Sequence, residues 1–349
     1  MKRQSIVFKA PYAIEIAEER MPEPSAAEVL IKTRYSAVSH GTEMLIYRGL
    51  FTTNLTADEA IPELRHPLRY PLKYGYAAVG EIIDAGPGVG RDLIGQTAFC
   101  LHPHESCFTV AADEIVPVPE DVDPLGALFL ANMETAVNFL MDGGPVIGEK
   151  VVVFGLGVVG LLTTALLAEF PLAALLPLDP FKHRREASRQ AGARLAMDPT
   201  RPDALQQINE LLGPDGKGGM ADLAYELSGN PEALNQAIAV TGFNGRIVIG
   251  SWYGSKPATV DLGGHFHRRR IRLISSQVST ISPGLSARWS RQRRFEIAWD
   301  MIRRHRPARF ITQRIPFAQA AEAYELIDKD HAATIQVVLE YERSRACTQ

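Results

Sequence analysis

The stretch Val151-Val-Val-Phe-Gly155-Leu-Gly157-Val-Val-Gly160 decides the fold, because it places a G-x-G-x-x-G pattern between an apolar strand and an apolar helix. In that setting the first glycine permits a tight turn, the second lets the backbone approach a pyrophosphate, and the third allows close packing of helix on sheet. The helix N-terminus then faces the phosphates. The stretch therefore predicts a βα unit that binds a dinucleotide.

Asp179 supports this prediction, because an acid nineteen residues after Gly160 ends the next expected strand. A carboxylate there accepts hydrogen bonds from both ribose hydroxyls and repels a 2′-phosphate, which favours NAD over NADP. Lys182, His183, Arg184 and Arg185 follow it, either as a solvated helix face or as cations that neutralise such a phosphate. Candidate cofactor contacts are Gly155, Leu156, Gly157, Val158, Val159, Gly160, Asp179 and Arg184.

On either side of this unit, two different patterns of secondary structure are expected. From about residue 121, strands expected at 151–154, 174–178, 223–226, 246–249 and 271–275 alternate with helices expected at 125–141, 158–169, 182–190, 202–212 and 231–240. Such alternation indicates a doubly wound parallel sheet. From residue 5 to 118, short β runs separated by Pro and Gly predict a mostly antiparallel β domain. The tail adds helices at 289–304 and from 316, then a strand at 334–341. The fold class is α/β.

Composition limits the classes of partner and compartment. A net charge of −3 and a pI near 6.3 give no general attraction to nucleic acid or anionic membrane, so we expect a small-molecule substrate. The first residues lack the apolar core of a signal peptide, and three cysteines without a C-x-x-C pair fit a reducing compartment, so a cytoplasmic protein is expected. Glycines interrupt the apolar run 151–167, which excludes it as a membrane span.

Three further motifs, in order along the chain, carry a resemblance: Ala85-Gly-Pro-Gly-Val89, Leu227-Ser-Gly229 and Arg246-Ile-Val-Ile-Gly250-Ser251. With the glycine loop they resemble the medium-chain dehydrogenase/reductase superfamily over nearly the full length. The resemblance implies a GroES-like catalytic domain at 1–135 and 278–349, a Rossmann domain at 136–277, an active site between them, and a homodimer or homotetramer. It adds Ser228, Gly229, Gly250, Ser251 and Ser276 as candidate cofactor contacts.

Zinc-dependent relatives carry C-G-T-D, then G-H-E, then a Cys or Glu on the helix before the Rossmann strand. The corresponding residues here are His40-Gly-Thr42-Glu43, Gly75-Tyr76-Ala77 and Glu134, so two ligand positions are lost. A catalytic zinc normally takes three protein ligands, so no zinc is expected unless His102 or His104 supplies one. The pattern is similar to the zinc-free branch that includes hydroxyethyl bacteriochlorophyllide dehydrogenase-like proteins, although Ala77 departs from its G-Y-E.

Without a metal, the charge that develops on a carbonyl oxygen must meet a hydrogen-bond donor. Tyr76 is then the candidate acid, Thr42 a proton relay, and His40 a group that tunes either. Glu134 is a candidate to orient His40 or a substrate hydroxyl. The structural alternatives are a packed tyrosine, a loop histidine held by a carbonyl, and a helix-capping carboxylate.

The segment 265–306 holds eleven arginines, either as a solvated face with inter-domain ion pairs or as recognition groups for an anionic substrate. The sequence thus predicts a zinc-free, NAD(H)-dependent oxidoreductase that interconverts a secondary alcohol and a ketone. Two alternatives stay open. One is a reductase of activated C=C bonds, and the other is a non-catalytic dinucleotide-binding protein whose arginines contact RNA.

Overall fold

A computed structural model describes residues 2–53, 55–59, 61–213 and 219–342. The chain forms two compact units, Met1–Ala131 with Arg306–Gln349, and Asn132–His305. The sequence placed the return to the first domain at residue 278, whereas residues 278–305 group with the second unit. The reason is the helix α9 (Arg291–His305), whose buried Arg294 bonds to Glu134 on α3 (Leu130–Gly143).

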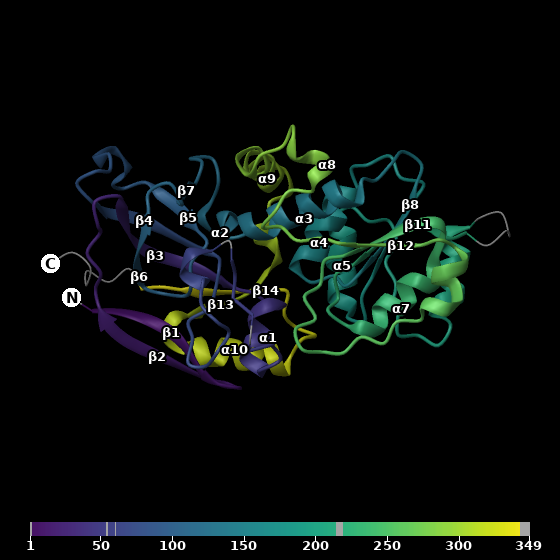
Figure 1. Ribbon diagram of the computed structural model, residues 1–349, viewed down its shortest axis with the longest axis horizontal. Helices are drawn as coiled ribbons and strands as arrows, with labels where there is room; N and C mark the ends of the chain where they lie inside the picture. The colour runs from purple at the N-terminus through teal and green to yellow at the C-terminus, as the bar shows by residue number, and fades with distance from the viewer. Residues whose placement is uncertain (1, 54, 60, 214–218, 343–349) are drawn as a thin grey trace. The chain divides into compact units, whose positions relative to one another are not determined.

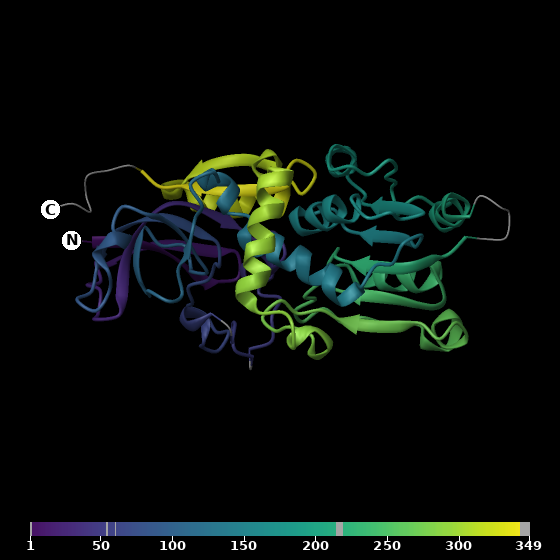
Figure 2. The same cartoon turned by 90° about the horizontal axis from the view of Figure 1, so that it is seen from above.

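The second unit is built on a five-stranded parallel sheet in the order β12-β11-β10-β8-β9, whose strands lie side by side in Figure 2. The strands are β8 (Lys150–Phe154), β9 (Ala174–Leu178), β10 (Ala221–Glu226), β11 (Thr241–Ile249) and β12 (Arg272–Ser275). Beyond β9, a single bridge between Leu178 and Met197 stands where a sixth strand would pair. The sheet confirms the predicted doubly wound Rossmann-type domain.

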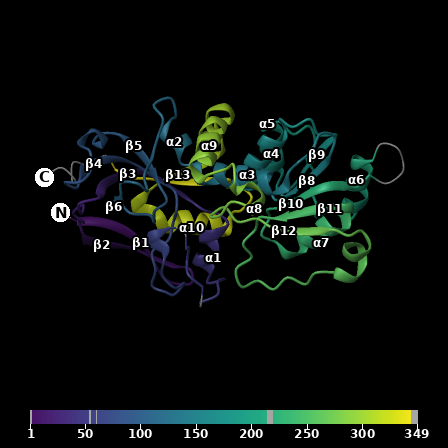
Figure 3. The same ribbon diagram turned by 45° about the horizontal axis from the view of Figure 1, so that its top comes forward.

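Helices cover both faces of this sheet (Figure 3). They are α4 (Val158–Leu167), α5 (Lys182–Gln190), α6 (Ala204–Leu212) and α7 (Pro231–Val240). Alternate strand residues such as Val152 and Leu176 share a buried core with Ile208 of α6 and Leu234 of α7. The helix expected at 125–141 is in fact two, α2 (Pro124–Ala127) and α3, because the Phe129 N–H bonds to the Gly126 carbonyl (3.1 Å) in a tighter turn.

The first unit contains a mostly antiparallel sheet in the order β13-β14-β3-β4-β5-β7, with β6 paired to β3, and a separate hairpin β1–β2 (Figure 1). Its strands are β1 (Lys2–Ala10), β2 (Ala13–Arg20), β3 (Glu28–Val38), β4 (Ala78–Ala85), β5 (Thr97–Cys100), β6 (Cys107–Ala111), β7 (Val116–Pro117), β13 (Ile311–Pro316) and β14 (Gln336–Glu340). The predicted β domain is confirmed, and β2 and β13 are additions to it.

Two helices cover one side of this unit, α1 (Thr42–Arg48) and α10 (Ala320–Lys329). Met44 of α1 and Tyr324 of α10 share a buried core with Phe8 and Leu339, so the two helices pack in one core. The short helix α8 (Pro283–Ser286) belongs to the second unit. Within the described residues, no helix has the length and apolar character needed to cross a membrane.

Candidate functional site

One edge of the parallel sheet gathers the predicted cofactor residues. Because all five strands run in one direction, their carboxyl ends meet at one edge, which is where open α/β sheets bind ligands. The glycine loop follows β8 and Asp179 follows β9. Ser228 and Gly229 follow β10, Gly250 and Ser251 follow β11, and Ser276 follows β12.

The three glycines of the loop are there for different reasons. Gly155 has φ +90°, and a Cβ there would lie 2.5 Å from the Ser228 Cα. A Cβ on Gly160 would lie 1.9 Å from the Gly155 carbonyl oxygen. Gly157 has φ −65°, and apart from its own neighbours along the chain no described residue has an atom within 4 Å of its Cβ position. The protein's own packing thus requires Gly155 and Gly160, whereas Gly157 leaves room for a ligand at the start of α4.

Asp179 is buried beside this loop. Its Oδ2 accepts a hydrogen bond from the Leu156 N–H (2.9 Å), and its Oδ1 accepts one from the Phe181 N–H (2.8 Å). Arg184 lies over the Phe181 ring, and its Nη1 is 3.8 Å from Asp179 Oδ2. The carboxylate is therefore held in a fixed orientation next to the glycine loop, with a guanidinium partly balancing its charge.

Glu226, at the end of β10, is a residue of this edge that the sequence did not single out. Its buried carboxylate accepts hydrogen bonds from the Ser228 N–H (2.8 Å) and the Tyr253 hydroxyl (2.6 Å). Ser251 Oγ accepts one from the Gly229 N–H (2.8 Å). These contacts order the loops after β10 and β11. The acid that ends the buried run Leu223-Ala-Tyr-Glu226 was the available signal.

In the first unit, the loop that leads into α1 gathers three of the four catalytic candidates. The Tyr76 hydroxyl donates to Ser39 Oγ (2.5 Å), and the Thr42 N–H donates to the same oxygen (3.3 Å). His40 is half-buried in the same turn. Burial raises the pKa of Tyr76 to about 12. Tyr76 is therefore a protonated donor at neutral pH. Ser39, its partner, had no signal in the sequence.

A buried hydrogen-bond network around Glu43 stabilises the loop that leads into α1. The Glu43 carboxylate accepts from the Ser39 N–H (2.8 Å), the Tyr324 hydroxyl (2.5 Å) and His104 Nε2 (2.8 Å). His104 Nδ1 bonds Ser36 Oγ (2.7 Å). Because an ionised carboxylate only accepts hydrogen bonds, this geometry assigns the Nε2 proton to His104. Both ring nitrogens of His104 are thus engaged.

Glu134 has a different partner from the ones expected. It was a candidate to orient His40 or a substrate hydroxyl, but its Oε1 accepts hydrogen bonds from Nε (3.0 Å) and Nη2 (2.7 Å) of Arg294. Burial raises the pKa of Glu134, and the charge of Arg294 opposes that rise. The sequence had no signal for this pair, because the two residues lie 160 positions apart.

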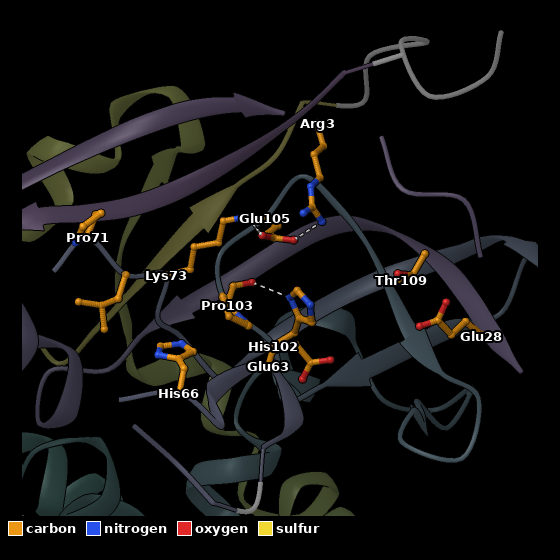
Figure 4. Close-up of a pocket in the computed structure, with 11 residues that line it drawn as sticks. Arg3, Glu28, Glu63, His66, Pro71, Lys73, His102, Pro103, Glu105 and Thr109 are labelled. Carbon is orange, nitrogen blue, oxygen red and sulfur yellow. Dashed lines mark hydrogen bonds and ion pairs between the residues drawn. The ribbon is translucent and has the colours of Figure 1, made fainter. Parts of the chain in front are cut away.

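A cavity of about 540 Å³ in the first unit is shown in Figure 4. At its wall Glu105 accepts from Arg3 (2.7 Å) and Lys73 (2.7 Å), so these charged groups already balance one another. His102 lies there flat against the Phe108 ring, 3.7 Å between centroids, and burial lowers its pKa to about 4. Among the residues that the structure describes, no three His, Cys, Asp or Glu side chains gather as metal ligands.

Several arginines of the segment 265–306 serve the fold. Arg269 donates to the Ala239 and Thr241 carbonyls, Arg303 pairs with Asp300 (2.8 Å), and Arg304 pairs with Glu169 (2.7 Å). These contacts favour the structural interpretation for these three residues.

Comparison with known proteins gives one family. The family model described as "Zinc-binding dehydrogenase" matches residues 158–295. D-guloside 3-dehydrogenase of Escherichia coli is 24% identical over 311 residues, covering 86% of this chain and 88% of that protein. L-threonine 3-dehydrogenase of Pyrococcus horikoshii is 26% identical over 284 residues, covering 72% and 76%.

Among solved structures, the alcohol dehydrogenase rspB from E. coli CFT073 has a TM-score of 0.78 with 20% sequence identity, covering 97% of this chain and 99% of that one. The likeness thus extends through both units. The chain is therefore similar in sequence to dehydrogenases of the medium-chain dehydrogenase/reductase superfamily, and it shares the fold of a solved alcohol dehydrogenase.

Proposed function

We propose that the protein is a zinc-free, NAD(H)-dependent oxidoreductase that interconverts a secondary alcohol and a ketone. The observation that carries the proposal is the space at Gly157, at the N-terminus of α4 and beside the oriented carboxylate of Asp179. A glycine that the protein's own packing does not need is what close approach of a pyrophosphate requires. The related rspB structure was solved with NADH.

The donor set supports a reaction without zinc. Tyr76 stands where zinc-dependent relatives have a histidine, and a phenol with a pKa of about 12 stays protonated and is a poor metal ligand. Glu134 already balances the charge of Arg294. His104 uses both ring nitrogens in hydrogen bonds. These residues do not fit a catalytic zinc.

When bound, the nicotinamide supplies the hydride for reduction of the carbonyl carbon or accepts it in the reverse direction. The chain's own residues then handle the proton. Tyr76 donates its hydroxyl proton to the substrate oxygen, and Ser39, which is itself bonded by the Thr42 N–H, holds that hydroxyl in place. We assign to His40, which is half-buried in the same turn, the role of tuning or reloading this proton donor.

The test is product analysis with NADH deuterated at C4 and a panel of ketones, after dialysis against a chelator. The proposal expects deuterium on the carbinol carbon and activity that the chelator does not change. Deuterium on a β-carbon would indicate reduction of a C=C bond instead. If NADH is not oxidised with any substrate of the panel while RNA is retained in a salt-sensitive way, the protein is a non-catalytic binder.

The choice between NAD and NADP is proposed to depend on Asp179. We expect Asp179→Ser to raise the ratio of kcat/KM for NADPH to that for NADH by about tenfold or more, because a like charge beside the 2′-phosphate is removed. The partly buried Arg185–Asp198 pair offers a matched control, Asp198→Asn, which should leave the ratio unchanged. An unchanged ratio in the Asp179 variant would exclude this role.

An anionic substrate is proposed from the arginines that precede and begin α9. We expect Arg288→Ala and Arg291→Ala each to raise KM for an anionic ketone by about tenfold, since a hydrogen bond to a charged group contributes about 1.5 to 3 kcal/mol. A neutral ketone of the same size, and the variant Arg303→Ala, serve as controls. Equal KM values for wild type and both variants would contradict the idea.

A further inference from the structure

One face of α3 carries three polar side chains, Glu134, Asn138 and Asp142. Because they are four residues apart, they lie in one row along the helix. Glu134 and Asn138 are buried, with exposed fractions of 3% and 1%. We call these three residues the polar row of α3. Burying polar side chains costs free energy unless each of them is hydrogen-bonded. The hydrogen-bond partners of the polar row therefore indicate its role.

The main partner is Arg294, which is 1% exposed. Its guanidinium has five N–H donors, and the structure gives it five hydrogen bonds. Two go to Glu134 Oε1, one to Asn138 Oδ1 (2.7 Å), one to the Thr280 carbonyl (3.3 Å) and one to the Val278 carbonyl (2.5 Å). Only the planar guanidinium of arginine can make these five hydrogen bonds, because a lysine ammonium has at most three N–H donors.

The second partner is Ser276, the first residue after β12. Its Oγ donates to Asp142 Oδ2 (2.5 Å) and accepts from Asn138 Nδ2 (3.0 Å), while its N–H donates to the Ile249 carbonyl (3.0 Å). Together with Arg294, the polar row therefore holds the segment 276–280 at three points, Ser276, Val278 and Thr280.

The segment 276–280 has neither helix nor strand, and it leaves the sheet at the carboxyl edge where the cofactor candidates gather. Gln277 and Ser279, between the anchored residues, are exposed. The groups of Ser276, Val278 and Thr280 that are anchored face α3 and α9. The backbone of the segment 276–280 is therefore held in one conformation, with the side chains of Gln277 and Ser279 exposed. A loop without regular structure can serve a binding site only if its surroundings hold its backbone in one conformation, and here side chains of two helices do so.

We propose that Arg294, with the polar row of α3, is a positioning residue of the cofactor site, acting through the segment 276–280. The inference rests on the proposed function. It assigns a role in binding the nicotinamide cofactor to an arginine that sequence patterns place on a solvated helix face. Arg294 itself is not a catalytic residue, because its donors are all used within the protein.

The test is titration of the full-length protein with NADH, following nicotinamide fluorescence, together with kcat and KM for a ketone. Arg294→Lys keeps a cation beside Glu134 but loses the fork to the two carbonyls. We expect it to raise the Kd for NADH by about tenfold, the value of one lost hydrogen bond to a charged group. Asn138→Ala keeps the Glu134–Arg294 pair and loses the bridge to Ser276, and a similar rise is expected.

Arg293→Ala is the matched control, because Arg293 lies on the same helix, over the Trp289 ring at the surface. It should change the Kd by less than about twofold. If Arg294→Lys and Asn138→Ala bind NADH as well as wild type and only their Tm is lower, the role of Arg294 is structural. That result would overturn this inference and leave the proposed function standing. If Arg294→Lys does not fold, Asn138→Ala decides by the same titration. Failure of wild type to bind NADH would overturn the proposed function as well.

Discussion

Replacing Gly157 with valine is expected to remove NADH binding and leave the fold intact. The side chain would occupy the space in which the pyrophosphate meets the N-terminus of α4, so the Kd for NADH should rise by more than about 100-fold, equivalent to about 3 kcal/mol. The backbone of Gly157, at φ −65° and ψ −177°, suits any residue. Replacing glycine at this helix N-cap should cost only about 1 kcal/mol of unfolding free energy.

Gly160→Ala is the matched comparison for this prediction. Its Cβ would meet the Gly155 carbonyl oxygen at 1.9 Å, so helix and strand must move apart. We expect it to lower the unfolding free energy by about 3 kcal/mol, the upper range for overpacking. Urea unfolding followed by circular dichroism, together with NADH titration, measures both quantities. If Gly157→Val binds NADH like wild type, this edge is not the cofactor site.

Tyr76→Phe is expected to lower kcat for ketone reduction by about 100-fold or more, the usual contribution of a positioned general acid. The Kd for NADH should stay unchanged, because Tyr76 belongs to the first unit and the glycine loop to the second. Tyr74→Phe is the control, since Tyr74 is a buried neighbour whose pKa is also raised by burial. Loss of activity in both variants would indicate a packing effect.

The pH dependence gives an independent check on Tyr76. Its pKa is raised to about 12 from an ordinary value of 10, so the hydroxyl keeps its proton up to that pH. The rate of reduction should therefore show no loss from Tyr76 ionisation below about pH 11, whereas oxidation of the alcohol, which needs the ionised form, should rise over that range. A reduction rate that falls with a pKa between 7 and 9 would assign the proton to another group.

Local signals in the sequence were enough for most of the fold. The expected strand 174–178 and helices 182–190 and 231–240 have the bounds found for β9, α5 and α7. Proline or glycine near their ends, together with apolar residues in the strand and in the helix 231–240, specify such elements without information from elsewhere in the chain. The G-x-G-x-x-G loop could be recognised by its spacing between strand and helix, although the contact of Gly155 with Ser228, far along the chain, could not be read from it.

The long-range partners of Glu43 and of the catalytic candidate Glu134 could not be predicted from such signals. Glu43 meets His104, 61 positions away, and Glu134 meets Arg294, 160 positions away. The residue that a single histidine or arginine will contact cannot be predicted from the neighbouring sequence, because the contact depends on how strands and helices pack. The sequence could therefore name Tyr76 and Glu134 by their place in a motif, but it could not show that one is a hydrogen-bonded donor and the other half of a buried ion pair.

The Glu43 network also has a consequence for protein synthesis. The loop that holds Tyr76 depends on Glu43, and Glu43 is bonded by Tyr324, 281 residues further along the chain. Strand β14, later still, pairs with β3, which leads into the same loop. On the ribosome, the first half of this unit must wait for the second unit and the last strand to be translated. The loop that holds Tyr76 therefore reaches its final geometry only after β14 has been translated, so a nascent chain that stops before β14 would lack this geometry.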